Sequence, residues 1–261
     1  MSHRARKRFG QHFLHDQSVI QRIVDCMNPS QDDTVVEIGP GLGALSKPLL
    51  QRLDRLQVVE LDRDVIPLLK GSCDAGSRLT VHEADALKFD FGQLLPDSGE
   101  PLRLCGNLPY NISTPLLFHL YHWSAGIRDM HFMLQKEVVD RLAAKPGDKL
   151  YGRLSVMTSY YCQADSLFNV GPEAFNPPPK VDSAVVRLIP HQAPPVELVS
   201  QESLSRVVTQ AFNQRRKTLG RIFKGQLNAE GFAELGIDPQ LRPERLSLQD
   251  FASIANALSR H

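Results

Sequence analysis

Apolar residues follow two alternating patterns between residues 34 and 135. Most of five short runs are nearly continuously apolar, which is typical of strands covered on both faces of a parallel sheet. These runs span residues 34–39, 56–62, 79–85, 102–110 and 130–135. Between them, apolar residues with helical spacing cover residues 43–53, 64–71 and 113–123. The alternation of strand and helix predicts an α/β domain built from βαβ units.

The pattern changes after residue 135. Helical spacing is found over residues 136–144 and 154–162, and strand-like runs follow at 166–170 and 182–190. The Pro-rich segment 190–195 has the composition of a linker, and the chain beyond it is helical in pattern almost throughout. We therefore expect an α/β domain with a basic N-terminal arm over residues 1–192 and a small all-helical domain over residues 193–261.

The composition is that of a soluble globular protein. The 261 residues are 42% hydrophobic, which is enough to bury a sizeable core. No apolar run approaches the roughly 20 residues of a membrane span, and the basic start leads into no signal-peptide core, so a cytoplasmic location is expected. Cys26, Cys73, Cys105 and Cys162 lie far apart without a C-x-x-C pair, so free thiols are expected rather than a zinc site or disulfides.

The formal net charge of +1 hides a segregation of charge along the chain. Residues 1–10 contain four Arg or Lys and no acid, and residues 200–261 hold nine basic against six acidic residues, whereas the segment between is net acidic. A basic run is more often an ordinary solvated surface. It would form a nucleic-acid footprint only if the two basic ends converge in space.

The string VVEIGPGLGALS, residues 35–46, places Gly39, Gly41 and Gly43 after a strand and before a helix. Without side chains, these positions let the backbone approach a bound nucleoside closely. The string also fits the looser dinucleotide pattern G-x-G-x-x-A. Glu60 follows Gly39 by twenty-one residues, where a ribose-binding acid belongs in proteins that bind a dinucleotide and in those that bind S-adenosylmethionine. A glycine turn without a ligand is the third interpretation.

The ends of the next two strands distinguish between these interpretations. Asp85 closes the third strand in HEAD, where a carboxylate can accept a hydrogen bond from an adenine amino group, and NLPY closes the fourth. The carboxyl ends of parallel strands share one edge of the sheet, and ligands bind at that edge. Glu60, Asp85 and the glycine turn together favour S-adenosylmethionine over a dinucleotide.

NLPY, residues 107–110, combines hydrogen-bond acceptors with a flat ring. The lone pair of an exocyclic amine is delocalised into the base, so an enzyme that methylates it needs acceptors that orient the N–H bonds. The side-chain carbonyl of Asn107 and the backbone carbonyl of Leu108 can be those acceptors. Pro109 holds Leu108 extended, and Tyr110 offers a face for an unstacked base. The alternative is an X-Pro turn with a core tyrosine.

The Asn-Leu-Pro-Tyr motif resembles that of the amino-group methyltransferases acting on adenine or cytosine. From about residue 4 to its end, the chain is similar to the small-subunit ribosomal RNA adenine dimethyltransferases in RKRFGQHFL, VVEIGPGLG, VVELDRD, GNLPYNISTPLLF, MLQKEV, YGRLSV, FNPPPKVDSAVV and AFNQRRKTL. The resemblance implies a Rossmann-like S-adenosylmethionine-dependent methyltransferase domain followed by a small C-terminal all-helical domain. It also implies dimethylation of N6 of two adjacent adenosines in the terminal hairpin loop of small-subunit rRNA during ribosome assembly.

The resemblance further implies roles for individual residues. The family commonly has Asn at position 12, where His can likewise donate or accept a hydrogen bond; without the family, a His beside Phe13 is an ordinary packing residue. Phe175 resembles the second wall of the adenine pocket, opposite Tyr110, and its alternative role is a core anchor under a Pro-rich loop. The family's cofactor contacts map to His12, Leu14, Gly39, Glu60, Asp85 and Asn107.

We predict direct methyl transfer from the sulfonium to the amine, without a metal and without a general base beside Asn107. Cys105 is interpreted as a small apolar strand residue rather than a nucleophile, because an amine needs no covalent activation. Two alternatives stay open. One is a large-subunit rRNA adenine methyltransferase of the antibiotic-resistance type, and the other is a non-catalytic RNA-binding assembly or transcription factor on the same fold.

RNA contacts are predicted at both basic ends of the chain. Residues 213–224 are expected to form one helical stretch on which Lys217, Arg221 and Lys224 share a face. The expected partner is small-subunit rRNA within the assembling subunit, and the protein is expected to be a monomer without membrane association. The predicted RNA-binding residues are Arg4, Arg6, Lys7, Arg8, Arg215, Arg216, Lys217, Arg221 and Lys224.

Overall fold

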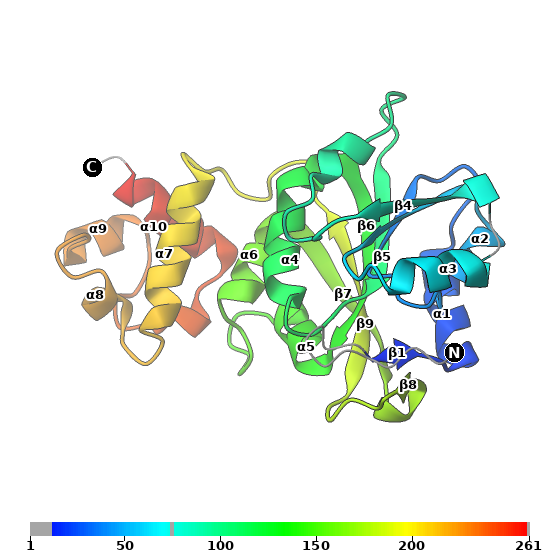
Figure 1. Cartoon of the computed structure of the whole chain (residues 1–261). Helices are drawn as coiled ribbons and strands as arrows, with labels where there is room; N and C mark the ends of the chain where they lie inside the picture. The colour runs from blue at the N-terminus through cyan, green and yellow to red at the C-terminus, as the bar shows by residue number, and fades with distance from the viewer. Residues whose placement is uncertain (1–11, 74–75, 260–261) are drawn as a thin grey trace. The chain divides into compact units, whose positions relative to one another are not determined.

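The computed structural model of the chain describes residues 12–73 and 76–259 (Figure 1). The chain divides into two compact units, one made of Met1–Val139 and Asp165–Pro190, and the other of Asp140–Ala164 and His191–His261. Residues 140–164 are thus grouped with the C-terminal helices, although they precede the boundary drawn from the sequence. The limits 1–192 and 193–261 stay a prediction.

A seven-stranded sheet forms the centre of the first unit, in the order β4-β3-β2-β5-β6-β9-β7. The first five strands of this order pair in parallel, and β9 then pairs antiparallel with β6. The five strands predicted from the apolar runs are confirmed, and with them the predicted α/β fold class. The strands are β2 (Val35–Ile38), β3 (Leu56–Glu60), β4 (Leu79–Glu83), β5 (Leu102–Asn107), β6 (Ile127–Gln135), β7 (Cys162–Val170) and β9 (Ser183–Pro190).

The close pairing of β2 with β5 depends on Gly106. A Cβ atom built on Gly106 would lie 2.3 Å from the carbonyl oxygen of Ile38, so no side chain fits there without displacing backbone. In the same register Val36 pairs with Leu104, and the end of β5 is carried to the turn that follows β2. Asn107, the last residue of β5, therefore lies next to Gly39, whose added Cβ would be 3.9 Å from the Asn107 carbonyl oxygen.

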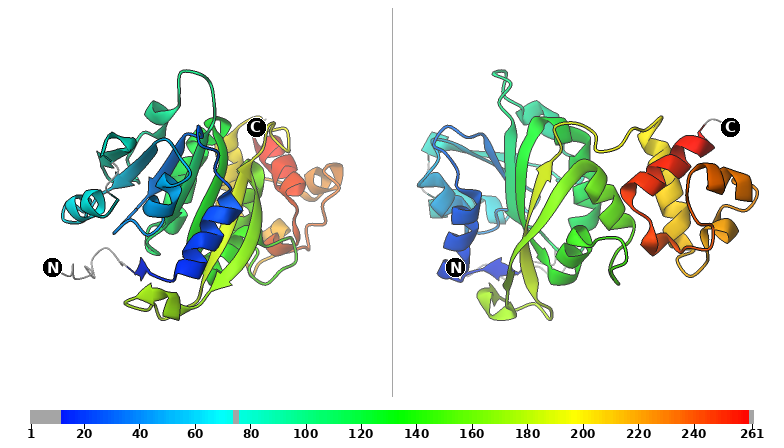
Figure 2. Two further views of the ribbon diagram at one scale, coloured as in Figure 1. Left: turned by 90° about the vertical axis from the view of Figure 1, so that its right-hand side faces the viewer. Right: turned by 180° about the vertical axis from the view of Figure 1, so that it is seen from behind.

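Helices cover both faces of this sheet, with α1 and α4 on opposite sides (Figures 1 and 2). Helix α1 begins where the side chain of Asp16 accepts hydrogen bonds from the backbone of Ser18 and Val19, and it ends at Asn28 in the left-handed conformation. Its apolar face joins the core cluster beneath the sheet. The α-helices of this unit are α1 (Gln17–Met27), α2 (Ser46–Leu50), α3 (Val65–Cys73) and α4 (Ser113–Leu120), and α5 (Lys136–Ala143) crosses the division.

A two-stranded ribbon joins distant parts of the same unit. Strand β1 (Phe13–Leu14) pairs antiparallel with β8 (Phe175–Asn176), with Leu14 opposite Phe175. Both Leu14 and Phe175 belong to the core cluster, so the ribbon is anchored by burial as well as by backbone hydrogen bonds.

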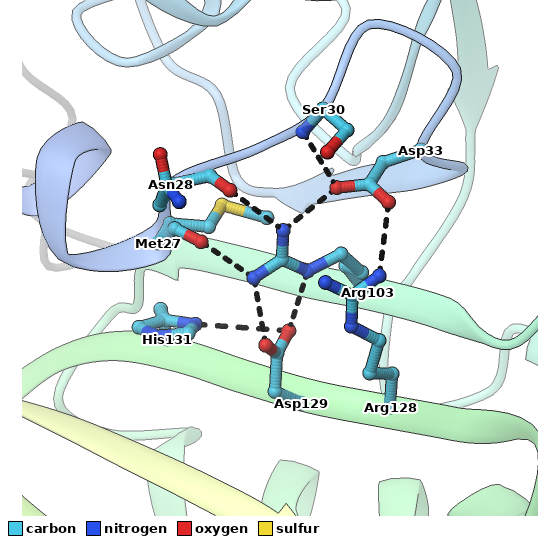
Figure 3. Close-up of polar contacts among 8 residues, drawn as sticks. All are labelled: Met27, Asn28, Ser30, Asp33, Arg103, Arg128, Asp129 and His131. Carbon is cyan, nitrogen blue, oxygen red and sulfur yellow. Dashed lines mark hydrogen bonds and ion pairs between the residues drawn. The ribbon is translucent and has the colours of Figure 1, made fainter.

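A buried guanidinium group holds together three segments near the amino end of β5 (Figure 3). Arg103 is 3% exposed and forms two bonds with Asp129 of β6, at 2.9 and 2.7 Å, and a third with Asp33 at 2.7 Å. Its remaining N–H groups donate to the backbone carbonyls of Met27 and Asn28 at the end of α1. Burial raises the pKa of Asp33, but the bonds from Arg103 and from the Ser30 backbone outweigh it and hold that pKa below its ordinary value.

The second unit is helical apart from the start of β7, and α7 packs against α10 and α6. Side chains define the helix starts: Ser200 accepts from the Ser203 backbone at the start of α7, and Ser247 and Asp250 cap α10 reciprocally. None of the helices in the described part of the chain is long and apolar enough to cross a membrane. The α-helices are α6 (Arg153–Tyr161), α7 (Gln201–Asn213), α8 (Leu219–Ile222), α9 (Ala229–Glu234) and α10 (Leu248–Leu258).

The predicted single helix over residues 213–224 is wrong. Helix α7 ends at Asn213, a turn follows, and α8 begins only at Leu219. The backbone N–H groups of Leu219 and Gly220 donate to the carbonyls of Leu241 and Pro239, both at 2.9 Å. These bonds to another segment replace the hydrogen bonds that a continuous helix would make, so helical spacing does not place Lys217, Arg221 and Lys224 on one face.

Candidate active site

The glycine turn after β2 lies at the carboxyl edge of the sheet. Gly39, Gly41 and Gly43 have φ angles of 67°, 52° and 86°, a conformation that favours glycine. A Cβ on Gly41 would lie 3.3 Å from two atoms of the Phe13 ring, so this position is also sterically confined. The turn is fixed to β3 because the Gly39 N–H donates to the Val59 carbonyl at 3.0 Å.

Glu60 ends β3 beside this turn. Its carboxylate accepts hydrogen bonds from the backbone N–H of Asp62 at 2.8 Å and of Gly41 at 3.4 Å. Burial raises the pKa of Glu60, and the backbone hydrogen bonds oppose that shift. Asp85, which follows β4, is partly exposed, and one of its carboxylate oxygens accepts from the Leu87 N–H at 3.0 Å. Glu60 therefore ends β3, and Asp85 lies two residues beyond the end of the neighbouring parallel strand β4, at the same edge of the sheet.

Leu61 is a feature of this edge that the sequence reasoning missed. It directly follows Glu60, and 48% of it is exposed even though it is a large apolar residue. Its neighbour Asp62 is only 3% exposed. The signal for it in the sequence was the apolar residue that directly follows the strand-end acid in VVELD. In the structure, Leu61 places an apolar surface next to the Glu60 carboxylate.

Glu37 and Ser46 form a hydrogen-bonded pair that the sequence did not predict. Glu37 lies within β2 at 1% exposure, and the Ser46 hydroxyl at the start of α2 donates to its carboxylate at 2.5 Å. Burial, with a smaller contribution from the charge of Glu60, raises the pKa of Glu37 to about 7. The pair links the two ends of the glycine turn. The signal was an acid inside the apolar run VVEIG.

The NLPY segment follows β5 directly. The side-chain amide nitrogen of Asn107 donates to the backbone carbonyl of His12 at 3.0 Å, and the Leu108 N–H donates to the carbonyl of Met133 on β6 at 3.2 Å. The Pro109 carbonyl accepts from the Ser113 hydroxyl at 3.0 Å, which joins the segment to the start of α4. The turn is thus fixed on both sides, and the orientation of the Asn107 amide follows from its donated bond.

Two groups hold the ring of Tyr110. Its hydroxyl bonds to the Ser183 hydroxyl at 2.7 Å, and Ser183 is fully buried at the start of β9. The His12 ring stacks on it, with ring centroids 5.7 Å apart and planes inclined by 26°. Burial raises the pKa of the Tyr110 hydroxyl. Sequence reasoning missed Ser183 because it lies 73 residues from Tyr110, and only the register of β9 brings the two together.

The predicted site residues differ in whether they lie at the edge of the sheet or in the core. Hydrogen bonds and close approaches connect five of them at the edge: His12, Gly39, Gly41, Glu60 and Asn107. Leu14 and Phe175 are 5% and 2% exposed in the core, so a wall role for the Phe175 side chain stays a prediction that requires it to be uncovered.

The predicted RNA-binding residues fall into two groups. Arg4, Arg6, Lys7 and Arg8 lie outside the described residues. In the second unit, Arg215 donates to the Lys149 carbonyl at 2.8 Å and lies 3.8 Å from Glu244, so it is engaged within the fold. The other predicted residues of this unit, Arg216, Lys217, Arg221 and Lys224, are exposed.

Comparison with known proteins identifies relatives over nearly the whole chain. The family model described as ribosomal RNA adenine dimethylase matches residues 2–260. A protein of Marinomonas sp. named ribosomal RNA small subunit methyltransferase A is 58% identical over 254 residues, which cover 97% of this chain and 95% of the relative. A protein of the same name from Pseudomonas aeruginosa is 56% identical and covers 98% of this chain and 96% of its own length.

Solved structures have the same fold. A dimethyladenosine transferase from Plasmodium falciparum superposes with a TM-score of 0.77 at 27% identity, covering 93% of this chain and 96% of its own. A 23S rRNA methyltransferase superposes with a TM-score of 0.74 at 23% identity, covering 95% and 99%. At the lower identity the likeness concerns the fold alone.

Proposed function

The chain belongs to the ribosomal RNA adenine dimethylase family, and on this premise we propose that it dimethylates N6 of two adjacent adenosines in the terminal hairpin loop of small-subunit rRNA. The observation that carries the proposal is the position of Asn107. It ends β5 beside the glycine turn, on the edge of the sheet that also carries Glu60. An amide acceptor and a nucleoside-binding edge are the two parts that methylation of an exocyclic amine requires.

The donor-binding residues fit S-adenosylmethionine. The glycine turn leaves its backbone open to close approach, Glu60 offers a carboxylate to ribose hydroxyls, and Asp85 offers one to the adenine amino group. Leu61 adds an exposed apolar side chain beside Glu60, suited to the face of the adenine. When bound, this cofactor supplies an activated methyl group on a sulfonium.

The target base is held by the residues of NLPY. The Asn107 side-chain oxygen and the Leu108 carbonyl are the acceptors that we assign to the N–H bonds of the adenine amine, which directs the nitrogen lone pair toward the methyl donor. Tyr110 supplies the stacking face, and Ser183 keeps its ring in place through the 2.7 Å hydroxyl bond. Proton loss can follow transfer, so the mechanism requires no basic side chain at Asn107.

Relatives favour the small subunit over the large one as substrate. Eight relatives at 52–58% identity carry the small-subunit name, whereas the 23S rRNA methyltransferase is only 23% identical. A non-catalytic RNA-binding factor is the other alternative. The connected glycine turn, Glu60 and Asn107 argue against it, because binding RNA alone requires none of them.

Substrate mapping tests the proposal. The protein is incubated with methyl-labelled S-adenosylmethionine and, in separate reactions, unmethylated small subunits, large subunits and duplex DNA, after which the labelled base is located. We expect dimethyladenosine in the small-subunit RNA alone. Label in the large subunit would support the antibiotic-resistance type, and absence of label in all three would support the non-catalytic factor.

A further inference from the structure

The imidazole of His12 lies against the ring of Tyr110. The two centroids are 5.7 Å apart with planes inclined by 26°, and the imidazole Nδ1 donates to the Pro177 carbonyl at 2.7 Å in the tautomer that carries its proton there. The Tyr110 ring is held as well, through its hydroxyl bond to Ser183. Two tethered rings therefore form a stacked pair at the end of NLPY.

This pair already uses the contact that a base would need. Stacked aromatic rings lie about 4.5–7 Å apart between centroids, so the face of Tyr110 under His12 is within ordinary stacking range of the imidazole. A planar base cannot stack on the same face while the imidazole remains there. The base must displace the ring or use another surface.

We propose that His12 is a placeholder for the target base: its ring occupies the stacking face of Tyr110 in the RNA-free protein and turns away when adenine enters. The inference rests on the proposed function. It assigns the side chain of position 12 to the base, in place of the cofactor contact that the family resemblance implies. The backbone of His12 stays beside the site, because its carbonyl accepts from Asn107.

The exchange makes His12 a positioning residue. Base entry requires the loss of one stacked pair and one hydrogen bond. The apparent association constant for the base is therefore the intrinsic one multiplied by the fraction of molecules in which the ring is turned away. A purine covers more of the tyrosine ring than an imidazole does, whereas a pyrimidine gains less from the exchange. The cost of displacing the histidine is the same for either base, so a purine offsets it more fully than a pyrimidine does.

Base insertion can be measured directly with 2-aminopurine. Small subunits are reconstituted with this fluorescent base at one of the two target adenosines and bound to saturating protein with S-adenosylhomocysteine. For His12→Ala we expect the insertion equilibrium to rise about five- to 150-fold, the range that an aromatic pair and one hydrogen bond together span. For His12→Trp, whose larger ring competes better, we expect a fall.

The control is His122→Ala. His122 is an exposed histidine whose Nδ1 also bonds to a backbone carbonyl, that of His119 at 3.0 Å, and which lies beside Trp123 rather than in the site. Its insertion equilibrium should match wild type, and S-adenosylmethionine affinity, measured by calorimetry, should be unchanged in all variants.

Several outcomes would overturn the inference. Reduced insertion in His12→Ala would mean that the imidazole supports the inserted base, and unchanged insertion would mean that it has no part in base entry. A large loss of cofactor affinity would instead assign the side chain to the cofactor. Failure of the proposed function is a separate result, because it would appear as absence of methylation of small subunits by the wild-type protein.

Discussion

Asn107 is the last residue of β5, and its side-chain nitrogen is already engaged by the His12 carbonyl. That bond orients the amide so that its oxygen is the group left to accept from the target amine. Replacement by Ala removes the acceptor while keeping the backbone.

We expect Asn107→Ala to lower kcat about 100- to 1000-fold, the cost of removing one preorganised polar group from a reacting centre. RNA affinity should stay within a few-fold of wild type, as measured by filter binding of small subunits. The matched control is Asn169→Ala, an exposed amide on β7, which should methylate at the wild-type rate. Near-normal turnover by Asn107→Ala would contradict the acceptor mechanism.

Glu37 predicts a pH dependence of stability. Its pKa is raised from 4.5 to about 7 in the folded protein, so between these values the folded state keeps a proton that the unfolded state has released. The free energy of unfolding therefore falls as pH rises through this window, by up to about 3 kcal/mol. Glu37→Gln keeps an oxygen that can accept from Ser46 but cannot ionise, so it should lack this loss.

Urea unfolding from pH 5 to pH 8 measures the difference. Relative to wild type, Glu37→Gln should gain stability steadily as pH rises. Glu100→Gln, an exposed loop carboxyl, serves as the control and should follow the wild-type curve. Parallel curves for wild type and Glu37→Gln would mean that the buried carboxyl does not titrate in this range.

At the scale of elements, Arg103 joins β5, β6 and the end of α1 from inside the fold. Arg103→Met fills the space but leaves the carboxylates of Asp33 and Asp129 without their buried partner. We expect a loss of about 3–5 kcal/mol in the free energy of unfolding, the usual result of removing one member of a buried ion pair.

Arg128→Ala is the matched comparison, because Arg128 also bonds to Asp33, at 3.1 Å, but its side chain is 51% exposed. Its loss should stay below about 1 kcal/mol. Thermal and urea unfolding of both variants decide the matter. Equal losses would show that burial does not distinguish the two cations, and S-adenosylmethionine affinity at low temperature should remain unchanged in both.

The sequence predicted the strands of the parallel sheet because burial on both faces leaves a continuous apolar run. It also predicted the glycine turn, Glu60 and Asn107, since strand ends at one edge follow from the βαβ order. It could not predict Ser183 beside Tyr110, which depends on the register of β9. The prediction of one helix over residues 213–224 was wrong because the backbone N–H groups of Leu219 and Gly220 bond to Leu241 and Pro239, a tertiary contact that local spacing does not encode.

At the scale of the whole molecule, the candidate active site and the predicted RNA-binding cations that the structure describes fall in different units. The candidate active site lies in the first unit, and the exposed cations around α8 lie in the second. We expect Arg221→Glu with Lys224→Glu to weaken binding to small subunits and to reduce the slope of log affinity against log salt by about one for each phosphate that the protein no longer neutralises. S-adenosylmethionine affinity should not change.

A salt series with wild type and two double variants tests this assignment. The second pair, Arg55→Glu with Lys70→Glu, makes the same change in net charge on exposed residues of the first unit. A slope that falls equally in both double variants would reflect overall charge rather than direct binding of phosphate. Loss of cofactor affinity in the Arg221 and Lys224 pair would indicate misfolding.

The ribbon of β1 and β8 has a consequence for the nascent chain. Phe13, whose ring lies close to Gly41, pairs with Asn176, and Tyr110 bonds to Ser183, so these two supports form only after residue 183 has emerged from the exit tunnel. Closing the loop between residues 13 and 176 is slow compared with the formation of the helices and hairpins within it. A chain truncated before residue 176 therefore carries Phe13 without its strand partner and Tyr110 without Ser183. The candidate active site is therefore complete only once most of the chain has been synthesised.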